Sequence, residues 1–315
     1  MGKNCSYIIL FGLIVLLFIL ENLSIKHDIN YNIDNDIDKV SKLKRNNIFD
    51  KCYQSPDNLN KRIIHLIITI FLIAFYYRNG FPKKLNESEY IPNGIRVMKK
   101  YLFLSLENQS CKNFIWILML GNQANITYIK SFFNFSNSFE KVILFQKDIK
   151  NYVGNISKGF DILITTRIDY DDLIYYDAVN DVRKAINIDE PVLLYGYNKG
   201  VYFYEPHNKY YEFNLNYKKD GVHGIFASLI INLKQVNDSY IIYELGDHSF
   251  IRKKLLNSYK SFGIKELSYE PAIFDHGEAK FIYVKQKFST TYNDSRVTPK
   301  ILKVYDFNLT KFLGK

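Results

Sequence analysis

The chain has 315 residues, of which 47% are hydrophobic and 16% aromatic, so it can bury a large core and is not disordered as a whole. Its formal net charge of +10 favours an anionic partner such as a nucleotide or a phospholipid surface. The sequence has no Arg-rich tract and no zinc-finger or RNA-recognition signature, which argues against nucleic acid as that partner.

The N-terminus contains the apolar run YIILFGLIVLLFIL at residues 7–20, which Lys3 precedes. This run predicts a membrane-targeting segment over residues 1–21, either an uncleaved signal anchor or a cleaved signal peptide. The next residues, ENLSIKHD, offer no small-x-small cleavage pattern, which favours the anchor. Lys3 before the run and the acidic DINYNIDNDID after it favour a cytoplasmic N-terminus. We therefore expect a single-pass type II membrane protein with its main domain on the lumenal or extracytoplasmic side.

Residues 22–60 are polar and rich in Asn and Asp, and they predict a tether. A second apolar run, IIHLIITIFLIAFYY, follows at residues 63–77. This run is rich in β-branched residues, contains His65 and is flanked by basic residues, so it predicts a buried strand. The alternative is a second membrane span, which would leave the globular part in the cytoplasm. Cys52 and Cys111 either form one disulfide in an oxidising compartment or remain unpaired thiols.

The remaining chain alternates between helix-like and strand-like segments. The predicted helices are 93–109, 126–135, 172–186 and 249–262, and the predicted strands are 113–120, 141–145, 160–166, 279–286 and a hairpin over 192–206 that turns at 198–200. In the first helix, four apolar residues share one face: Ile95, Met98, Leu102 and Leu106. The order predicts a largely parallel α/β sheet in a domain of residues 61–288, followed by a C-terminal extension of residues 289–315.

Three carboxylates, those of Asp169, Asp171 and Asp172, follow the predicted strand FDILITT. Clustered carboxylates are costly unless they are paired or bound to a metal, and ligands of open α/β sheets bind outside the carboxyl ends of strands. Mg²⁺ or Mn²⁺ prefers such oxygen ligands and would hold the diphosphate of a nucleotide. Alternatively, Asp171 or Asp172 caps the following helix, which leaves the third carboxylate and the neighbouring Arg167 unexplained.

The segment TTRIDYDD and the helix after it resemble the Arg-hydrophobic-Asp-x-Asp-Asp segment of the rhamnosyltransferase family, small glycosyltransferases with a GT-A-like nucleotide-sugar fold. The resemblance extends over residues 63–288 and includes HLIITIF, FIWILML and GDHSFIRKKL. It departs from the family at Thr69-Ile70, where the family usually has Thr-Arg, and in KQKFSTTYN, which lacks the family's histidine.

The resemblance implies a transferase that moves a sugar from a nucleotide-diphosphate donor to a hydroxyl of a glycan, lipid or protein acceptor. It implies that Asp169 and Asp171 hold the metal and that Arg167 pairs with the carboxylates or reaches the phosphates. His248 either binds the metal or the phosphate or has a structural role at the start of the following helix. Asp172 would bind the metal through water or orient the loop.

An inverting transferase also needs a base near the acceptor hydroxyl. Asp247 is the candidate, with a helix N-cap as its alternative role, and Asp275-His276 is a second pair of the same kind. Three tyrosines could stack on a base or a sugar, or simply pack along a strand: Tyr197, Tyr202 and Tyr204. The departure at Thr69-Ile70 leaves a second class of function open, a catalytically inactive, membrane-tethered carbohydrate-binding module.

Overall fold

The computed structural model describes residues 52–53, 60–71, 87–121, 124–133, 138–197, 199–214, 226–236, 241–245, 251–264, 272–275, 277–285 and 304–315. All of these residues belong to one unit of the chain, residues 49–315. The predicted membrane-targeting segment, most of the tether, and the candidates Asp247, His248 and His276 lie outside the described residues. No helix in the described part of the chain is long and apolar enough to span a bilayer.

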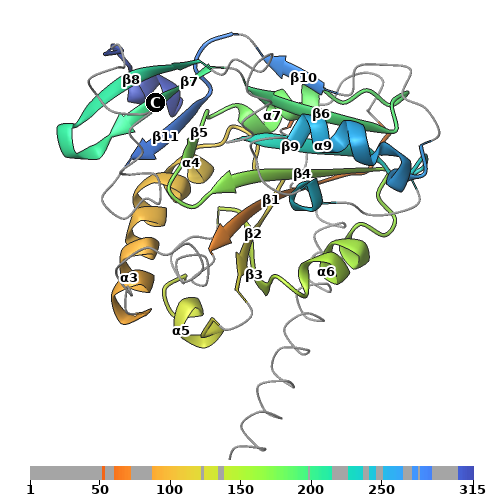
Figure 1. The fold of residues 1–315 in the computed structure, drawn as a ribbon, viewed down its shortest axis with the longest axis horizontal. Helices are drawn as coiled ribbons and strands as arrows, with labels where there is room; N and C mark the ends of the chain where they lie inside the picture. Colours follow the sequence, from red (N-terminus) through yellow and green to blue (C-terminus); the bar gives the residue numbers. More distant parts are fainter. Residues whose placement is uncertain are drawn as a thin grey trace, which may run out of the picture. The chain divides into compact units, whose positions relative to one another are not determined.

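Two β-sheets form the framework of this unit (Figure 1). The central sheet has seven strands in the order β10-β6-β9-β4-β1-β2-β3. Their bounds are β1 Ile63–Phe71, β2 Ile115–Leu120, β3 Glu140–Phe145, β4 Ile162–Asp169, β6 Val192–Tyr197, β9 Ala227–Asn232 and β10 Ala272–Asp275. Strand β9 runs antiparallel to both of its neighbours, β4 and β6, and the other pairs are parallel. The fold is therefore a mixed α/β fold, and the predicted parallel sheet is right except for β9, which the sequence analysis did not assign.

The apolar run that begins at Ile63 forms a strand, as predicted. Strand β1 is buried along almost its whole length and β2 is buried at every position. Continuous burial is expected where helices cover both faces of a sheet, and β-branched isoleucines suit its pleated surface. Residues 72–77 of the run lie outside the described residues.

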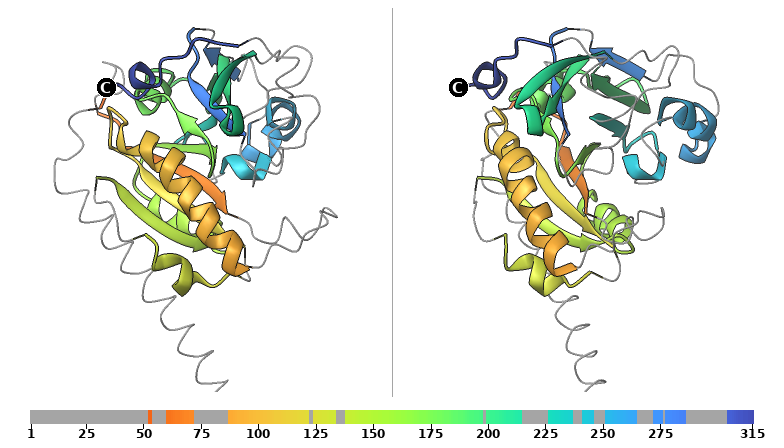
Figure 2. Two further views of the ribbon diagram at one scale, coloured as in Figure 1. Left: turned by 90° about the vertical axis from the view of Figure 1, so that its left-hand side faces the viewer. Right: turned by 60° about the vertical axis from the view of Figure 1, so that its left-hand side comes forward.

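Helices lie on both sides of the central sheet, with α3 on one side and α9 on the other (Figure 2). The α-helices in the described residues are α3 Glu87–Met98, α4 Leu104–Glu107, α5 Ile126–Lys130, α6 Ile149–Ile156, α7 Ala178–Lys184, α9 Ile251–Ser258 and α10 Leu309–Phe312. Lys99–Phe103 is a π-helical stretch (η2) that joins α3 to α4, and the short 3₁₀ helices described are η3 Glu205–His207, η4 Ile242–Leu245 and η6 Tyr259–Phe262. The predicted helix 93–109 is confirmed, although it begins earlier, and its four apolar residues are all buried.

The predicted helix from residue 172 is wrong in its first part. Leu173–Ile174 forms the short strand β5, and α7 begins only at Ala178 with Asp177 at its N-cap position. An apolar pair fits a strand as well as a helix, and here it pairs with β11, Phe281–Lys285. Neither Asp171 nor Asp172 therefore caps this helix.

The predicted hairpin over 192–206 is also wrong. Strand β6 belongs to the central sheet, whereas β7, Lys199–Tyr204, belongs to a second sheet with the order β5-β11-β7-β8. The hairpin partner of β7 is β8, Lys209–Asn214, which it reaches through η3. Gly200 is needed at the start of β7, because a Cβ there would lie 2.2 Å from the Phe281 ring.

The C-terminal residues pack against the second sheet. Phe312 and Leu313 are buried in a cluster with residues of α3, β7 and β11, such as Val97, Phe203 and Ile282. Val304 also forms an isolated bridge with Tyr211 of β8. Part of the segment that the sequence analysis assigned to a C-terminal extension thus contributes to the core of this sheet.

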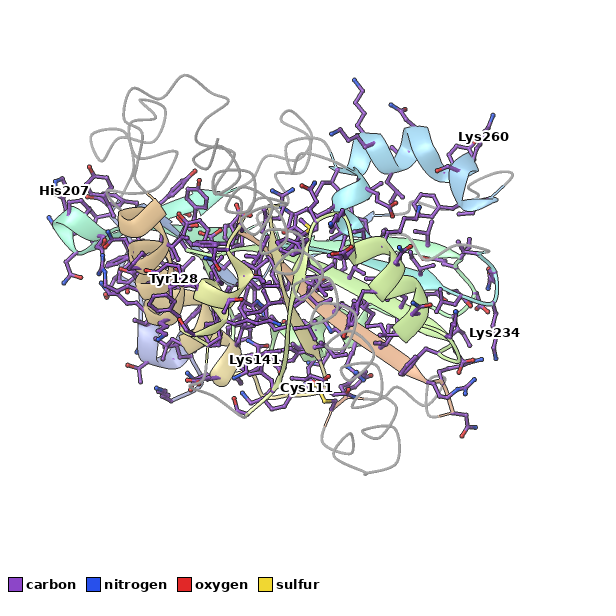
Figure 3. The ribbon with its side chains drawn as sticks, turned by 90° about the horizontal axis from the view of Figure 1, so that it is seen from below. Cys111, Tyr128, Lys141, His207, Lys234 and Lys260 are labelled. Carbon is purple, nitrogen blue, oxygen red and sulfur yellow. A yellow bond between two sulfur atoms is a disulfide. The ribbon has the colours of Figure 1, made fainter. Side chains whose placement is uncertain are left out.

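Of the two alternatives for the cysteines, the structure has the disulfide. Cys52 and Cys111 are bonded, with their Cα atoms 4.9 Å apart (Figure 3). The backbone N–H of Tyr53 also donates a hydrogen bond to Asn180 of α7 over 2.9 Å. The end of the tether is therefore fixed close to the start of β2.

Candidate functional site

The parallel strands of the central sheet all end on the same side, which we call the carboxyl edge. Because β9 is antiparallel to both β4 and β6, the strands β6 and β10 run in the same direction as β4. The carboxyl edge is defined by the last residues of these strands: Phe71, Leu120, Phe145, Asp169, Tyr197 and Asp275. This is the edge at which open α/β sheets bind their ligands.

Arg167 and Asp169 lie on one face of β4 at the carboxyl edge, because alternate residues of a strand share a face. Arg167 Nη2 is 3.7 Å from Asp169 Oδ1, and the two side chains are 11% and 28% exposed. Ala227 of β9 pairs in register with Arg167, and Gly196 of β6 pairs with Ala227. Both of these residues are small. The positions of β9 and β6 that are in register with Arg167 therefore carry no bulky side chain.

The other two carboxylates differ in environment. Asp172 is buried at 1% exposure, and its Oδ1 accepts a hydrogen bond from the backbone N–H of Val284 in β11 over 3.2 Å. Its own N–H donates to the carbonyl of Asp169 over 3.3 Å. Asp172 thus ties the turn after β4 to the second sheet. Asp171 is also buried, at 8% exposure.

Tyr243 of η4 packs against Arg167, with the guanidinium carbon 4.8 Å from the centre of the tyrosine ring. Its hydroxyl donates a hydrogen bond to the carbonyl oxygen of Ile68 over 3.1 Å. Burial raises the pKa of Tyr243, and Asp169 acts in the same direction while Arg167 opposes it, so the phenol is protonated at neutral pH. Tyr243 could not be predicted as part of the site, because no motif or spacing in the sequence links it to β4.

Thr69-Ile70, where the sequence departs from the pattern of the family that it resembles, also lies at this edge. Ile70 of β1 stands directly beside Asp169 in register, so an arginine there would lie next to this carboxylate. The preceding Thr69 accepts a hydrogen bond from the indole N–H of Trp116 over 3.0 Å, which joins two of the segments that carry the resemblance. Arg167 is therefore the basic residue that the described strands β1 and β4 place beside Asp169.

The candidate tyrosines mostly pack inside the protein. Tyr197 is 2% exposed, its ring stacks on that of Phe226, and its hydroxyl donates to Asp181 Oδ2 over 3.2 Å. Tyr202 is 7% exposed and stands opposite Tyr211 of β8. For these two residues the structure shows the packing role that the sequence analysis gave as the alternative to stacking on a ligand. Tyr204 is partly buried, with its ring against that of His207.

On the opposite face of the central sheet, polar side chains form a buried row. His65 Nε2 is 2.7 Å from Thr166 Oγ1, which is 2.6 Å from Ser228 Oγ. Burial and the charge of Arg183 hold the pKa of His65 well below its usual value. Arg183 of α7 is itself buried, which lowers its pKa to about 10, and it donates to the carbonyl of Asn113 over 3.3 Å. Within the described ranges no carboxylate lies within ion-pair distance of Arg183.

Among the residues that the structure describes, no group of three or more His, Cys, Asp or Glu side chains is arranged to hold a metal ion. Of the predicted metal ligands, Asp169 and Asp171 are described: Asp169 ends β4 and Asp171 lies in the turn after it. His248 is outside the described residues. The backbone of Asp275 belongs to β10 at the carboxyl edge, and nothing is described of its side chain.

No protein-family model matches the sequence, and no curated protein matches it. Among solved structures, the chain is similar to S. aureus TarS 1-349 at 13% identity and a TM-score of 0.37, over 70% of this chain and 60% of that one. It is similar to HddC from Yersinia pseudotuberculosis at 14% identity and a TM-score of 0.32, over 70% and 93% of the two chains. A third similar structure is the inositol-1-phosphate CTP transferase from T. maritima, at 11% identity and a TM-score of 0.33, over 70% and 89%.

Proposed function

We propose that this chain is a metal-dependent glycosyltransferase that binds a nucleotide-diphosphate sugar at the carboxyl edge of its central sheet. The observation that carries the proposal is the pair of Arg167 and Asp169, a cation and a partly exposed carboxylate on one face at the end of a central strand. A carboxylate suits a divalent cation, and a guanidinium suits phosphate oxygens. A metal-bound diphosphate presents both kinds of partner at once.

In this proposal two of the described carboxylates, those of Asp169 and Asp171, bind the divalent cation. Asp169 is exposed enough to offer an oxygen, and Asp171 follows it in the same turn. We leave Asp172 out of the ligand set because its Oδ1 is already held by Val284. Two carboxylates suffice for Mg²⁺ or Mn²⁺ when phosphate oxygens and water complete the coordination. The ion would supply positive charge that stabilises the leaving diphosphate.

The protein's own residues then have distinct tasks. Arg167 orients the diphosphate and adds a second positive charge at the edge. The turn that Asp172 holds to β11 fixes the backbone on which Asp169 and Asp171 stand. Asp247 remains the proposed general base, and the helix η4, which ends two residues before it, is fixed on β4 by the hydrogen bond from Ile242 N–H to Thr165 Oγ1 over 2.9 Å.

The proposal includes a membrane-tethered protein of type II with its domain on the lumenal or extracytoplasmic side. The Cys52–Cys111 disulfide supports this placement, because disulfides persist mainly in oxidising compartments. The acceptor in the proposed reaction is a hydroxyl of a glycan, lipid or protein.

Thermal unfolding of the full chain tests the proposal. The protein is titrated with UDP, GDP, CDP or TDP, with and without Mn²⁺, as the parent and as Asp169→Asn. The matched control is Asp189→Asn, an exposed aspartate that precedes β6 at the other edge of the sheet. We expect one nucleotide to raise the unfolding temperature only with Mn²⁺, in the parent and the control but not in Asp169→Asn. Saturation at about 100 times the Kd corresponds to about 2.7 kcal/mol of stabilisation.

Two results would contradict the proposal. One is a parent protein that is folded but that no nucleotide stabilises. If this protein also binds a glycan, the result favours the inactive carbohydrate-binding module. The other is an equal shift in the parent and in Asp169→Asn, which would place the nucleotide elsewhere.

A further inference from the structure

Arg167 has a long, flexible side chain at the proposed site. Its affinity for a phosphate depends on how far its conformation is restricted before binding. A free arginine loses much side-chain entropy when it binds a phosphate, so a residue that restricts it beforehand strengthens binding. In the structure the guanidinium carbon lies 4.8 Å from the centre of the Tyr243 ring, within the distance of a cation–π interaction. The partner that restricts Arg167 on this side is therefore an aromatic ring.

Tyr243 is itself held from several directions. Its hydroxyl donates to the carbonyl of Ile68 in β1. The preceding Ile242 is fully buried, and its N–H donates to Thr165 of β4, two residues before Arg167. The next residue, Glu244, pairs with Lys150 of α6 over 3.1 Å. The ring thus belongs to a turn that is anchored to two central strands and to a helix.

We infer that Tyr243 is a positioning residue that holds the Arg167 guanidinium in place to receive the diphosphate of the donor. This inference rests on the proposed function and deepens it, because it names the residue that organises the phosphate-binding arginine. The ring leaves the charge of Arg167 in place, because its face attracts a cation without neutralising it. The hydroxyl contributes by fixing the ring on β1.

Two substitutions separate the ring from the hydroxyl. Tyr243→Phe keeps the ring and loses the hydrogen bond to Ile68, whereas Tyr243→Leu removes the ring. Tyr128→Leu is the matched control, because Tyr128 on α5 is 38% exposed and its ring contacts Phe132 (Figure 3). All proteins are titrated calorimetrically with the nucleoside diphosphate that stabilises the parent, in the presence of Mn²⁺.

We expect the Kd of Tyr243→Phe to stay within about twofold of the parent and that of Tyr243→Leu to rise about 5- to 10-fold. The Kd of Tyr128→Leu should equal that of the parent. Arg167→Met removes the guanidinium that binds the nucleotide in the proposed site. Adding Tyr243→Leu to this variant should therefore not raise the Kd further. This lack of additivity is a result that a purely structural role for the ring would not give.

The inference and the proposed function can fail separately. If the parent binds nucleotide and Tyr243→Leu binds it equally well, or if the two substitutions are additive, the positioning role is overturned and the proposed function stands. Unfolding temperatures without ligand report the contact itself when they are measured for the parent, Tyr243→Leu, Arg167→Met and the double variant. We expect the loss in the double variant to be smaller than the sum of the two single losses. If no nucleoside diphosphate binds the folded parent, both proposals are overturned.

Discussion

The two edges of the central sheet use their charged residues differently. At the edge where β4 begins, Asp161 accepts a hydrogen bond from the backbone N–H of Arg62 over 2.8 Å and pairs with Lys234 over 3.1 Å. Burial raises the pKa of Asp161, but these contacts outweigh it and leave the pKa below its usual value. At the carboxyl edge, the Asp169 side chain beside Arg167 is 28% exposed, against 8% for the side chain of Asp161. We interpret the first edge as structural and the carboxyl edge as the binding edge.

The comparison predicts that changes at the first edge alter stability without altering nucleotide binding. The Cys52–Cys111 disulfide lies on this side and joins residues 59 positions apart. Closing a loop of this length restricts the unfolded chain by about 4 kcal/mol in the chain-entropy model. We expect the variant Cys52→Ser/Cys111→Ser to lose most of this free energy of unfolding, as measured with a denaturant, and to keep the nucleotide Kd of the parent. A Kd that rises more than about threefold at a temperature where the variant is folded would contradict the division between the edges.

Substitutions of two buried arginines, Arg167 and Arg183, give a second test of which residues bind the nucleotide. We expect Arg167→Met to raise the nucleotide Kd about 10- to 100-fold, because a charged hydrogen bond contributes about 1.5–3 kcal/mol. Arg183→Met is the matched control, since Arg183 is also buried, at 2% exposure against 9% for Arg167, but lies in α7 with a backbone carbonyl as its acceptor. Its Kd should be unchanged, and its stability should change by less than about 1 kcal/mol, because relief of the buried charge offsets the lost hydrogen bond. Equal effects of the two variants on calorimetric binding would contradict the assignment of Arg167.

Much of this arrangement could be predicted from the sequence, because strands β1, β2 and β4 are continuous apolar runs with clear ends. The end of β4 placed Asp169 at the carboxyl edge without any structural information. The hairpin prediction failed because the turn signal at 198–200 is local, whereas Gly200 is required by the distant Phe281 ring. Tyr243 could not be predicted, since its contact with Arg167 depends on how η4 packs on β4.

The buried histidine predicts a pH dependence that does not involve the carboxyl edge. Below its ordinary pKa of 6.5, His65 binds a proton in the unfolded chain but not in the folded one, because burial and then Arg183 lower its folded pKa. The free energy of unfolding should therefore fall as the pH drops below 6.5, by up to about 1.4 kcal/mol per pH unit, until the folded pKa is reached. Denaturant titrations from pH 7 to pH 4 measure this slope.

His65→Gln should remove this part of the slope, and His207→Gln, a change at an exposed histidine in η3, should keep it. Arg183→Met should raise the folded pKa of His65 and end the slope at a higher pH. A slope in His65→Gln identical to that of the parent would show that other groups cause the pH dependence.

The smallest expected effect is that of Asp161→Asn at the first edge. The amide oxygen can still accept the hydrogen bond from Arg62 N–H, so only the attraction to Lys234 and Arg62 is lost, about 1 kcal/mol or less. Because the folded pKa of Asp161 is lowered, its contribution is present above the unfolded value of 3.8 and is lost as the pH falls through the folded pKa. Denaturant titrations at pH 7 and pH 3 should therefore show a smaller difference between parent and variant at the lower pH. A difference that is as large at pH 3 as at pH 7 would show that the substitution acts through packing.

The most direct test of the binding edge is electron paramagnetic resonance of Mn²⁺, which reports the free ion by its six-line signal. The full chain is mixed with substoichiometric Mn²⁺ and the nucleoside diphosphate, as the parent, as Asp169→Asn and as the control Asp189→Asn. We predict that the parent and the control reduce the free-ion signal below the level that nucleotide alone produces, and that Asp169→Asn does not. An equal reduction by the parent and Asp169→Asn, or none by the parent, would contradict a metal-bound nucleotide at the end of β4.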